Sequence, residues 1–467
     1  MSLPCRVSRK SMLVKIVCAV ALSAAAATDD AHARDLGHEM LPANDGWAAD
    51  PPATTGGAAA DAQHVFVVSD RQQLVAALAF PDATPKIIYV SGRIEANADD
   101  NGQPLQCSDY ITSDPQGTEV YSLSAYLAVY DPATWGTTTL PSGPQERARA
   151  ASQLLQQARM RIRIGANTTI VGLGANAEIH GGWFDIRPTS GPVTAEMNVI
   201  VRNLNFRDVF DCFPQWDPTD GSSGNWNSAY DAISIQHAAH VWIDHNYLWD
   251  DATNDAGEPH YFGRLYQIHD GLIDITNQAD QITASWNHLA QHDKVSLFGS
   301  SDSATADAGK LRITLHHNWY DNVVERGPRV RFGQVHIYNN YYSMPDAATF
   351  QYSWGVGKSS LIYADSNAID GAAGVTAAIV IKAFKGTAIF AQNSLFNGVA
   401  TDLVASYNAA NATPLSTDVG WTPQLHLAIA APEAVAAAVQ ACAGPLADSD
   451  TPDGILRDSF EAVCSEP

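Results

Sequence analysis

The segment Ile282-Thr283-Ala284-Ser285-Trp286-Asn287 decides the fold of this chain, because similar segments recur on both sides of it. Each is a short run of strand-forming residues that closes on asparagine. The segments are Val199–Asn203, Val241–Asn246, Ile282–Asn287, Ile313–Asn318, Val335–Asn340, Ile362–Asn367 and Ala388–Asn393. From Asn287 onwards the closing asparagines are about 22 to 31 residues apart, and before it about 40. Recurrence at this spacing is typical of a solenoid whose coils stack on one another.

The recurring strands predict an all-β fold, a parallel β-helix with long loops on one side and short flanking helices. A single coil cannot bury its own inner face, so successive coils must stack to form a core. An asparagine at the same corner of every coil tolerates the left-handed backbone of a sharp turn, and its amide can bond to the next asparagine in the stack. The alternative is a β-propeller, whose blades need about 40 to 50 residues and hairpin turns. Two-residue hairpin signals are scarce in this sequence.

The sequence divides into four segments. Residues 1–33 have the basic start, short apolar run and small residues of a secretory signal peptide, so we expect the protein to be secreted. Residues 34–63 are rich in Ala, Gly, Pro and Asp and are interpreted as a flexible leader. The β-helix is expected over residues 64–432, followed over 433–467 by an alanine-rich helix and an acidic tail. No later stretch is long and apolar enough to span a membrane.

The chain is strongly acidic, with 27 basic and 50 acidic residues and a formal net charge of −23. A field of this sign repels nucleic acid and anionic lipid, so neither is expected as a partner. A polyanionic substrate would have to be held by a local basic cluster or by bridging cations. We expect the protein to act as a monomer.

Six cysteines are present, and Cys5 and Cys18 leave with the signal peptide. The other four are an even number in an exported chain, which favours disulfide bonds. Cys442 and Cys464, which flank the C-terminal tail, are predicted to pair. The second predicted pair is Cys107 with Cys212.

Acidic residues begin the stretch of sequence that is richest in candidate functional groups. Asp270 and Asp274 flank Gly-Leu-Ile, and Asp231 lies about one enlarged coil earlier. If the three carboxylates converge, they form a site of hard oxygen ligands for calcium. A single aspartate at a turn more often caps the backbone, so it is the combination that favours a metal site.

Basic residues follow these acids in a protein that has few cations. Lys294 lies in the middle of the stretch, and Arg326, Arg329 and Arg331 end it. Strand alternation places Arg329 and Arg331 on one face. Because a guanidinium is a planar fork that matches a carboxylate, the cluster favours a polymer of uronic acids as ligand over a neutral glycan. Ion pairing of these arginines with acids such as Glu325 is the structural alternative.

Histidines and tryptophans allow further interpretations. The histidines of this region are His288, His292, His316, His317 and His336. Because the sequence has no H-E-x-x-H motif, we expect stacking or hydrogen-bonding roles for them and not a zinc site. Trp216 and Trp226 lie in a loop rich in Gly, Ser and acids, which suits a groove wall where sugar rings stack and further cations bind. A purely structural loop is the alternative.

These motifs resemble those of the secreted pectate lyases of polysaccharide lyase family one. The similarity extends from about residue 64 to about residue 421, and the loop at 213–227 is similar to that of the bacterial, calcium-dependent, alkaline-active branch. The matching motifs are W-I-D-H-N at 242–246, D-G-L-I-D at 270–274, H-D-K at 292–294, H-H-N at 316–318 and R-G-P-R-V-R-F-G at 326–333. The resemblance implies a right-handed parallel β-helix and β-eliminative cleavage of α-1,4-linked polygalacturonate (pectate), which leaves an unsaturated non-reducing end.

The resemblance also implies a role for each candidate residue. The primary Ca2+ would be held by Asp231, Asp270 and Asp274. Further calcium ions that bridge to substrate carboxylates would be held with the help of Asp220 and Asn227. The substrate would be bound by Lys294, Arg329 and Arg331, and Arg326 would be the catalytic base.

Two positions depart from the family pattern. Glu325 stands where glutamine is expected, and a carboxylate close to Arg326 would oppose the lowering of the arginine pKa that a base requires. Strand alternation predicts that Glu325 points away from Arg326. Ile233 stands where some relatives carry a fourth acidic ligand, so the three-carboxylate form of the site is expected.

Three other functions are compatible with such a fold. A pectin lyase acting on methyl-esterified chains would lack the calcium ligands. A polygalacturonase would hydrolyse its substrate with paired carboxylates and no metal. A non-catalytic pectin-binding β-helix would fit the repeats alone, and only the cluster of Lys, Arg and Asp residues speaks against it.

Overall fold

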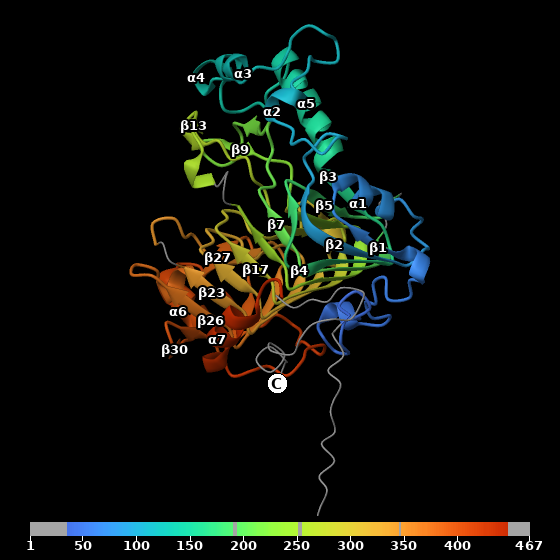
Figure 1. The fold of residues 1–467 in the computed structure, drawn as a ribbon. Coiled ribbons are helices and arrows are strands. Elements are labelled where there is room, and N and C mark those ends of the chain that lie inside the picture. Colours follow the sequence, from blue (N-terminus) through green and yellow to red (C-terminus); the bar gives the residue numbers. More distant parts are fainter. Residues whose placement is uncertain (1–34, 190–193, 251–254, 345–346, 447–467) are drawn as a thin grey trace, which may run out of the picture. The chain divides into compact units, whose positions relative to one another are not determined.

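Three ladders of parallel strands make up most of the computed structural model, which describes residues 35–189, 194–250, 255–344 and 347–446 (Figure 1). The first ladder contains β1 (Val65–Val68), β2 (Lys86–Glu95), β4 (Thr168–His180), β6 (Ala195–Arg202), β11 (Ala238–Asp244), β16 (Asp280–Ser285), β19 (Arg312–His316), β22 (Gln334–Tyr338), β25 (Leu361–Asp365) and β28 (Ile389–Gln392). The second contains β7 (Asn205–Arg207), β12 (Tyr247–Trp249), β17 (His288–Ala290), β20 (Trp319–Asp321), β23 (Tyr341–Met344), β26 (Ala368–Gly371) and β29 (Leu395–Phe396).

The third ladder contains β3 (Arg161–Ile164), β5 (Trp183–Ile186), β10 (Ile233–Gln236), β15 (Ile273–Thr276), β18 (Leu297–Phe298), β21 (Arg329–Val330), β24 (Trp354–Gly357) and β27 (Ile381–Phe384). From β10 onwards, apart from the separate hairpin of β13 (His260–Tyr261) and β14 (Arg264–Leu265), three consecutive strands form one coil and enter the three ladders in turn. Each strand therefore pairs with the strand one coil later in the sequence, and the predicted parallel β-helix is confirmed.

Alternation of side chains builds the core and exposes the candidate site. Ile233 and Ile235 of β10 are buried in the main apolar core, and so are Ile273 and Ile275 of β15. The residue between them in each strand faces outward, because successive side chains of a strand point to opposite faces. The third ladder thus presents a row of polar side chains on its outer face.

The predicted asparagine ladder is confirmed. The side-chain oxygen of Asn287 accepts hydrogen bonds from the backbone N and the Nδ2 of Asn246, both at 3.0 Å. The same two bonds recur from coil to coil through Asn318, Asn340 and Asn367. All five amides are buried, so each coil satisfies the polar groups of the next.

At these five corners the left-handed backbone lies one residue earlier than predicted. It belongs to the residue before each ladder asparagine, with φ between 48° and 52°: His245, Trp286, His317, Asn339 and Ser366. At Asn203 and Asn393, by contrast, the closing asparagine itself has the predicted left-handed backbone, with φ of 58° and 53°. The five ladder asparagines are therefore required for their paired donor and acceptor, and not for their tolerance of a positive φ. Their neighbours point out of the corner, where aromatic rings stack, as Trp286 does on His317 with ring centroids 4.2 Å apart.

The histidines of the region have packing and hydrogen-bonding roles, as expected. His288 lies between Tyr247 and Trp319, with ring centroids 4.3 and 4.1 Å away. These rings belong to β12, β17 and β20, so the stack follows the second ladder. His316 likewise stacks on Tyr338 at 4.9 Å.

Residues 35–63 differ from the flexible leader that was expected, because they lie packed against the first ladder. The 3-10 helix η1 (Trp47–Ala49) places its backbone amides on threonines of β16 and β19: Ala48 N donates to Thr283 Oγ1 at 3.2 Å, and Trp47 N to Thr314 Oγ1 at 3.0 Å. Leu41, Ala48 and Ala49 bury themselves against Ile200 and Trp242. The small residues that suggested flexibility are what allow such close contact with a sheet.

The excursion between β2 and β3 has an aromatic core of its own. It carries α2 (Cys107–Tyr110), α3 (Leu123–Val129), α4 (Pro132–Trp135) and α5 (Pro144–Met160), and in Figure 1 these lie beside β9 (Asn225–Asn227) and β13 (His260–Tyr261). Trp216 and Trp226 are 0% and 1% exposed in this core. The interpretation of these two tryptophans as a sugar-stacking wall is therefore wrong, because their faces are covered by protein.

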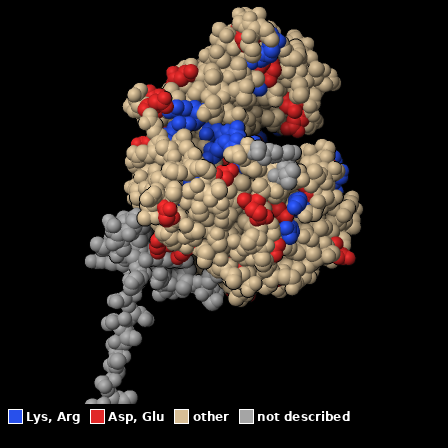
Figure 2. All heavy atoms as spheres, turned by 90° about the vertical axis from the view of Figure 1, so that its right-hand side faces the viewer, with Lys and Arg blue, Asp and Glu red and all other residues tan. Residues whose placement is uncertain are grey.

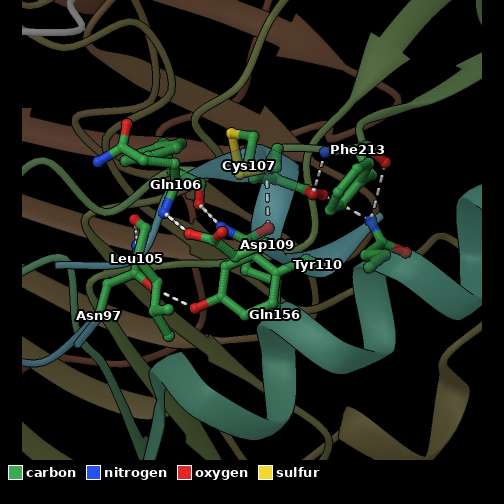
Figure 3. The surroundings of a disulfide bond; sticks show 12 residues. Asn97, Leu105, Gln106, Cys107, Asp109, Tyr110, Gln156 and Phe213 are labelled. Carbon is green, nitrogen blue, oxygen red and sulfur yellow. Dashed lines mark hydrogen bonds between the residues drawn. A yellow bond between two sulfur atoms is a disulfide. The ribbon is translucent and has the colours of Figure 1, made fainter. Parts of the chain in front are cut away.

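One disulfide fastens this excursion to the β-helix. Cys107, at the start of α2, is bonded to Cys212, which precedes β8 (Gln215–Asp217), and the predicted pair is confirmed. Figure 3 shows Cys107 among the residues that cap α2, where Gln106 N donates to Asp109 Oδ2 at 2.7 Å. Tyr110 also donates to the Asn97 side chain beside it. The other predicted pair, Cys442 with Cys464, cannot be placed because Cys464 lies outside the described residues.

Two helices follow the last coils. The first is α6 (Leu403–Ala410), and the second, α7 (Pro432–Cys442), covers the predicted alanine-rich segment. Val435 and Val439 of α7 pack on Tyr341 and Ala368 of the second ladder. Among the described residues, no helix has the length and apolar character needed to cross a membrane.

Candidate active site

The candidate residues stand just before or within four successive strands of the third ladder. Asp231 precedes β10, Asp270 precedes β15, Asp274 lies within β15, Lys294 precedes β18 and Arg326 precedes β21. Backbone hydrogen bonds join the segments that lead into these strands, for example from Leu272 N to Val295 O at 2.9 Å and from Ser296 N to Arg326 O at 2.9 Å. Residues almost a hundred positions apart in the sequence are thus neighbours on one face.

The carboxylates of Asp231 and Asp274 converge at the turn that contains Gly271. Asp231 Oδ1 accepts a hydrogen bond from Gly271 N at 3.0 Å. A Cβ atom at position 271 would lie 2.2 Å from Asp274 Oδ1 and 3.0 Å from Asp231 Oδ1. Only glycine therefore lets both carboxylates occupy this turn.

The third carboxylate, that of Asp270, is the most open of the three. Its Oδ1 lies 3.9 Å from Lys294 Nζ. The side chain of Asp270 is 31% exposed, whereas that of Lys294 is 13% exposed, so the lysine reaches the acid from within the wall of the site. Anionic and cationic groups meet here on adjacent coils.

Burial and mutual repulsion raise the pKa values of the two inner carboxyls. Burial raises the pKa of Asp231 well above its ordinary value, and the charges of Asp274 and Asp270 raise it further. Burial and the charge of Asp270 likewise raise the pKa of Asp274 to about 7, against a smaller lowering effect of Arg326. Carboxylates kept close together without a cation behave in this way.

Hydrogen-bond donors of the chain take up part of this charge. Ser234 donates its hydroxyl to Asp231 Oδ2, and Leu297 N donates to Asp274 Oδ1 at 2.9 Å. In the described part of the chain, no group of three or more His, Cys, Asp or Glu side chains has the convergent geometry of a closed metal centre. Asp231 and Asp274 each accept one of these bonds, whereas Asp270 faces Lys294.

Arg326 is paired with its sequence neighbour, against expectation. Its Nε lies 3.1 Å from Glu325 Oε1, and both side chains are 15% exposed. The prediction that Glu325 points away is wrong because Arg326 has a φ of 63°. A left-handed residue interrupts strand alternation and brings the two side chains to one side.

The acids around Arg326 keep it protonated. Burial by itself lowers the pKa of Arg326, but the charges of Glu325, Asp270 and Asp274 outweigh burial, and the net shift is upward. Two of these three acids are the candidate metal ligands.

Arg329 and Arg331 lie on one face of β21 and its extension, as predicted, with Val330 buried between them. Arg331 Nε lies 2.9 Å from Asp302 Oδ1, and its terminal nitrogen donates to Gly299 O at 2.8 Å. The Arg329 guanidinium lies over the ring of Phe384, 4.0 Å from its centroid. Burial, followed by the charge of Arg331, lowers the pKa of Arg329.

Asp220 and Asn227 belong to the hairpin of β8 and β9. Asp220 is exposed between the two strands and accepts a hydrogen bond from Asn225 Nδ2 at 2.9 Å, while Asn227 ends β9 opposite Gln215. None of the hydrogen bonds or ion pairs of the described residues joins Asp220 or Asn227 to the three aspartates. The described contacts of Asp220 and Asn227 thus lie within their own hairpin.

A buried pair beneath the site was not singled out from the sequence. His292 bonds Asp250 Oδ2 through Nδ1 at 2.6 Å and the backbone oxygen of Asp270 through Nε2 at 2.7 Å. Burial lowers the pKa of His292, but the charge and hydrogen bond of Asp250 raise it to about 9. The pair fixes the turn that presents Asp270. The sequence carries the motif H-D-K at 292–294, but only the fold shows that Asp250 is the partner.

Comparison with known proteins identifies the family. A family profile described as "Pectate lyase" matches residues 142–436. The chain is 51% identical over 439 residues to the pectate lyase of Bacillus subtilis (strain 168), covering 92% of this chain and 99% of that protein. It is 32% identical over 408 residues to pectate lyase E of Dickeya dadantii (strain 3937), covering 85% and 82%.

Solved structures agree. A pectate lyase bound to a hexasaccharide is 50% identical, with a TM-score of 0.81, and the match covers 88% of this chain and 99% of that one. The pectate lyase of Acidovorax avenae subsp. citrulli is 30% identical, with a TM-score of 0.79, and the match covers 94% and 100%. Sequence, fold and the order of the motifs lead to one conclusion: this chain belongs to the pectate lyase family.

Proposed function

We propose that the protein cleaves pectate by calcium-dependent β-elimination and leaves an unsaturated non-reducing end. The observation that carries this proposal is the sequence of groups along the third ladder, where three aspartates, Lys294 and Arg326 follow one another on adjacent coils. Paired carboxylates without a lysine or arginine would suit hydrolysis instead.

The donor set fits calcium. Asp231, Asp270 and Asp274 offer hard oxygen ligands, and the Gly271 turn leaves room for the inner two carboxylates where any side chain would displace them. The raised pKa of Asp274, about 7, is the mark of negative charge that lacks a counterion. When bound, calcium would neutralise these acids and help to stabilise the charge that develops on the uronate. Asp220 and Asn227 would assist further calcium ions from the β8–β9 hairpin.

The remaining roles belong to basic side chains. Lys294, Arg329 and Arg331 would bind uronate carboxylates, because their charges fix and orient an anionic sugar. Arg326 would accept the C5 proton, which is acidified by the adjacent carboxylate, and the bond to O4 would then break. A base must first be neutral, so the acids that raise the Arg326 pKa oppose this role until they are neutralised.

The start of the chain supports a secreted enzyme, and we propose that it acts as a monomer. Residues 1–33 have the sequence pattern of a signal peptide. The proposed catalytic domain spans residues 64–432, with residues 34–63 in front of it and a helix and acidic tail over 433–467. Mass spectrometry of the secreted protein and light scattering in solution test the cleavage position and the monomeric state.

The activity is tested with polygalacturonate and ultraviolet absorbance of the unsaturated product. We expect product with calcium, none with chelator, and a loss of at least about 100-fold in kcat for Arg326→Ala. Arg93→Ala, on the first ladder, is the matched control and should keep full activity. Reducing ends without absorbance would mean hydrolysis, binding without cleavage would mean a binding module, and full activity in chelator would refute the calcium role.

A further inference from the structure

The first two strands of the third ladder carry a second group of arginines that the proposed function does not use. Arg161 and Arg163 lie on β3, where Ile162 and Ile164 face the core, so both arginines are on the outer face. Arg187 follows β5 directly. This group, Arg161, Arg163 and Arg187, is called here the distal arginine cluster.

The distal arginine cluster has more positive charge than its surroundings need. Asp185 is 0% exposed, and its carboxylate accepts hydrogen bonds from Arg161 Nε at 2.6 Å and from Arg187 Nε at 2.5 Å. Arg163 is exposed and donates to the backbone oxygen of Pro188 at 2.7 Å. One buried carboxylate requires one cation, and here three guanidinium groups accompany it. Since both bonds to Asp185 use Nε, the terminal amino groups of Arg161 and Arg187 lie outside those bonds.

The cluster is in register with the aspartates of the candidate site. Strand pairing aligns Arg163 with Asp185, Asp185 with Ser234, and Ser234 with Asp274, all on the outer face. Neighbouring strands are about 4.8 Å apart, which is close to the length of one hexose unit in a chain. A polysaccharide that crosses the strands at Asp274 therefore reaches the distal arginine cluster about two or three sugar units later.

A chain of hydrogen bonds links the neighbourhood of the distal arginine cluster to the aspartates of the candidate site. Trp183 Nε1 donates to Ser234 Oγ at 2.7 Å, and Ser234 donates in turn to Asp231. The guanidinium groups of Arg161 and Arg187 lie 5.4 and 6.0 Å from the Trp183 ring centroid, which holds them on the face of the ladder. Figure 2 shows that the largest group of lysine and arginine side chains on the face it presents gathers in a hollow of the surface.

We propose that the distal arginine cluster is a remote subsite that binds carboxylates of the same polyuronate chain, on the side of the aspartates opposite to Arg329 and Arg331. This proposal rests on the proposed function, because the ligand is its substrate. In a protein with a net charge of −23, a polyanion is repelled by most of the surface. Basic groups at both ends of the row of strands would hold a long chain across the cleavage position.

The test compares substrates of two lengths in variants of Arg163, the exposed member of the cluster. KM is measured for a galacturonate trimer and an octamer with Arg163→Ala, Arg163→Glu and wild type. We expect the ratio of octamer KM to trimer KM to rise about threefold for alanine and about tenfold for glutamate, since only the octamer spans the distance. Arg93→Ala and Arg93→Glu are the controls and should leave the ratio unchanged.

Each outcome decides the matter. An unchanged ratio in variants that keep the melting temperature of wild type would overturn the proposal, as would an equal change for both substrates. A wild type that releases no unsaturated product would refute the proposed function instead. In that event the affinities of octamer and trimer, measured by calorimetry with the same variants, still test whether the distal arginine cluster binds a polyuronate.

Discussion

Arg326 is the residue on which the proposed chemistry makes the greatest demand. An arginine keeps its proton at any ordinary pH because its unperturbed pKa is above about 12. In the structure the charges of Glu325, Asp270 and Asp274 move that pKa further up, against the effect of burial. Cations on the two aspartates would cancel their part, and Glu325 would then be the remaining acid beside the base.

Replacing Glu325 by glutamine should therefore shift the activity of the enzyme towards lower pH. Without the carboxylate 3.1 Å from its Nε, Arg326 loses its proton more easily, so a larger fraction is neutral at a given pH. We expect the ascending limb of the pH profile of kcat, where activity rises as the base loses its proton, to move down by about one unit. The control is Glu196→Gln, whose partner is His240 on the first ladder. An unchanged profile would mean that Arg326 is not the titrating base.

Asp274 should lower stability when calcium is absent. Its folded-state pKa of about 7 lies above the ordinary value of 3.8, so folding becomes less favourable as the pH rises from about 4 to 7. In chelator at pH 8, Asp274→Asn should raise the free energy of unfolding by about 2 kcal/mol. Below pH 4 the difference from wild type should disappear.

Calcium should make wild type more stable than Asp274→Asn, which reverses the order of stability expected in chelator. Wild type should gain melting temperature on addition of calcium, while Asp274→Asn should gain little because a ligand is missing. Thermal unfolding with and without chelator measures both effects. If the variant is less stable than wild type in chelator at pH 8, the carboxylate repulsion inferred from the structure is wrong.

At the scale of the element, the asparagine ladder is what fixes coil on coil. Asn318 accepts two hydrogen bonds from Asn287 and donates to Ala284 O and Asn340 Oδ1, all within the buried corner. Asn318→Ala should lower the free energy of unfolding by about 2 to 4 kcal/mol, because it leaves several buried partners unsatisfied. The control is Asn397→Ala, which removes an exposed asparagine whose side chain has both of its described hydrogen bonds to the Gly371 backbone. Equal losses in denaturant titrations would contradict a special role for the buried corner.

The ladder also shows how far sequence reasoning reaches. Its spacing and its closing asparagines sufficed to predict the parallel β-helix and the stacking of the amides, because a repeated side chain in a solenoid meets its own copy. At the five ladder corners the left-handed residue was misplaced by one position, since φ is a property of the backbone path. His245 and Trp286 adopt the left-handed conformation although neither residue type signals it.

The candidate site was predicted where it follows from the repeat, and missed where it depends on loops. Strand register and the turn at Gly271 bring Asp231 and Asp274 together. By contrast, Trp216 and Trp226 are indistinguishable in sequence from a sugar-binding pair, and only the packing of the excursion buries them. The proximity of Glu325 and Arg326 likewise depends on one left-handed residue that interrupts the strand rule.

At the scale of the whole molecule, the net charge opposes binding of the proposed substrate, whereas local groups of cations favour it. The net charge of −23 repels a polyuronate at long range. The cations that would bind it are few, and several are partly neutralised, as Arg331 is by Asp302 and Arg161 by Asp185. The attraction between these cations and a uronate therefore acts over a few ångströms. The repulsion between the acidic surface and the polymer acts over the Debye length, which the salt concentration sets.

Monovalent salt should consequently raise kcat/KM for polygalacturonate when calcium is kept constant and in excess. Between about 10 mM and 100 mM salt the Debye length falls from about 30 Å to about 10 Å, which screens the long-range repulsion more than the contacts inside the site. We expect a rise of about two- to fivefold for the polymer and a smaller one for a trimer, which carries fewer charges. Initial rates of ultraviolet absorbance measure both. A fall in kcat/KM for the polymer would contradict this expectation. It would show that the attraction of the local basic groups extends further than the repulsion of the acidic surface, so that the field of the protein steers the substrate towards the site.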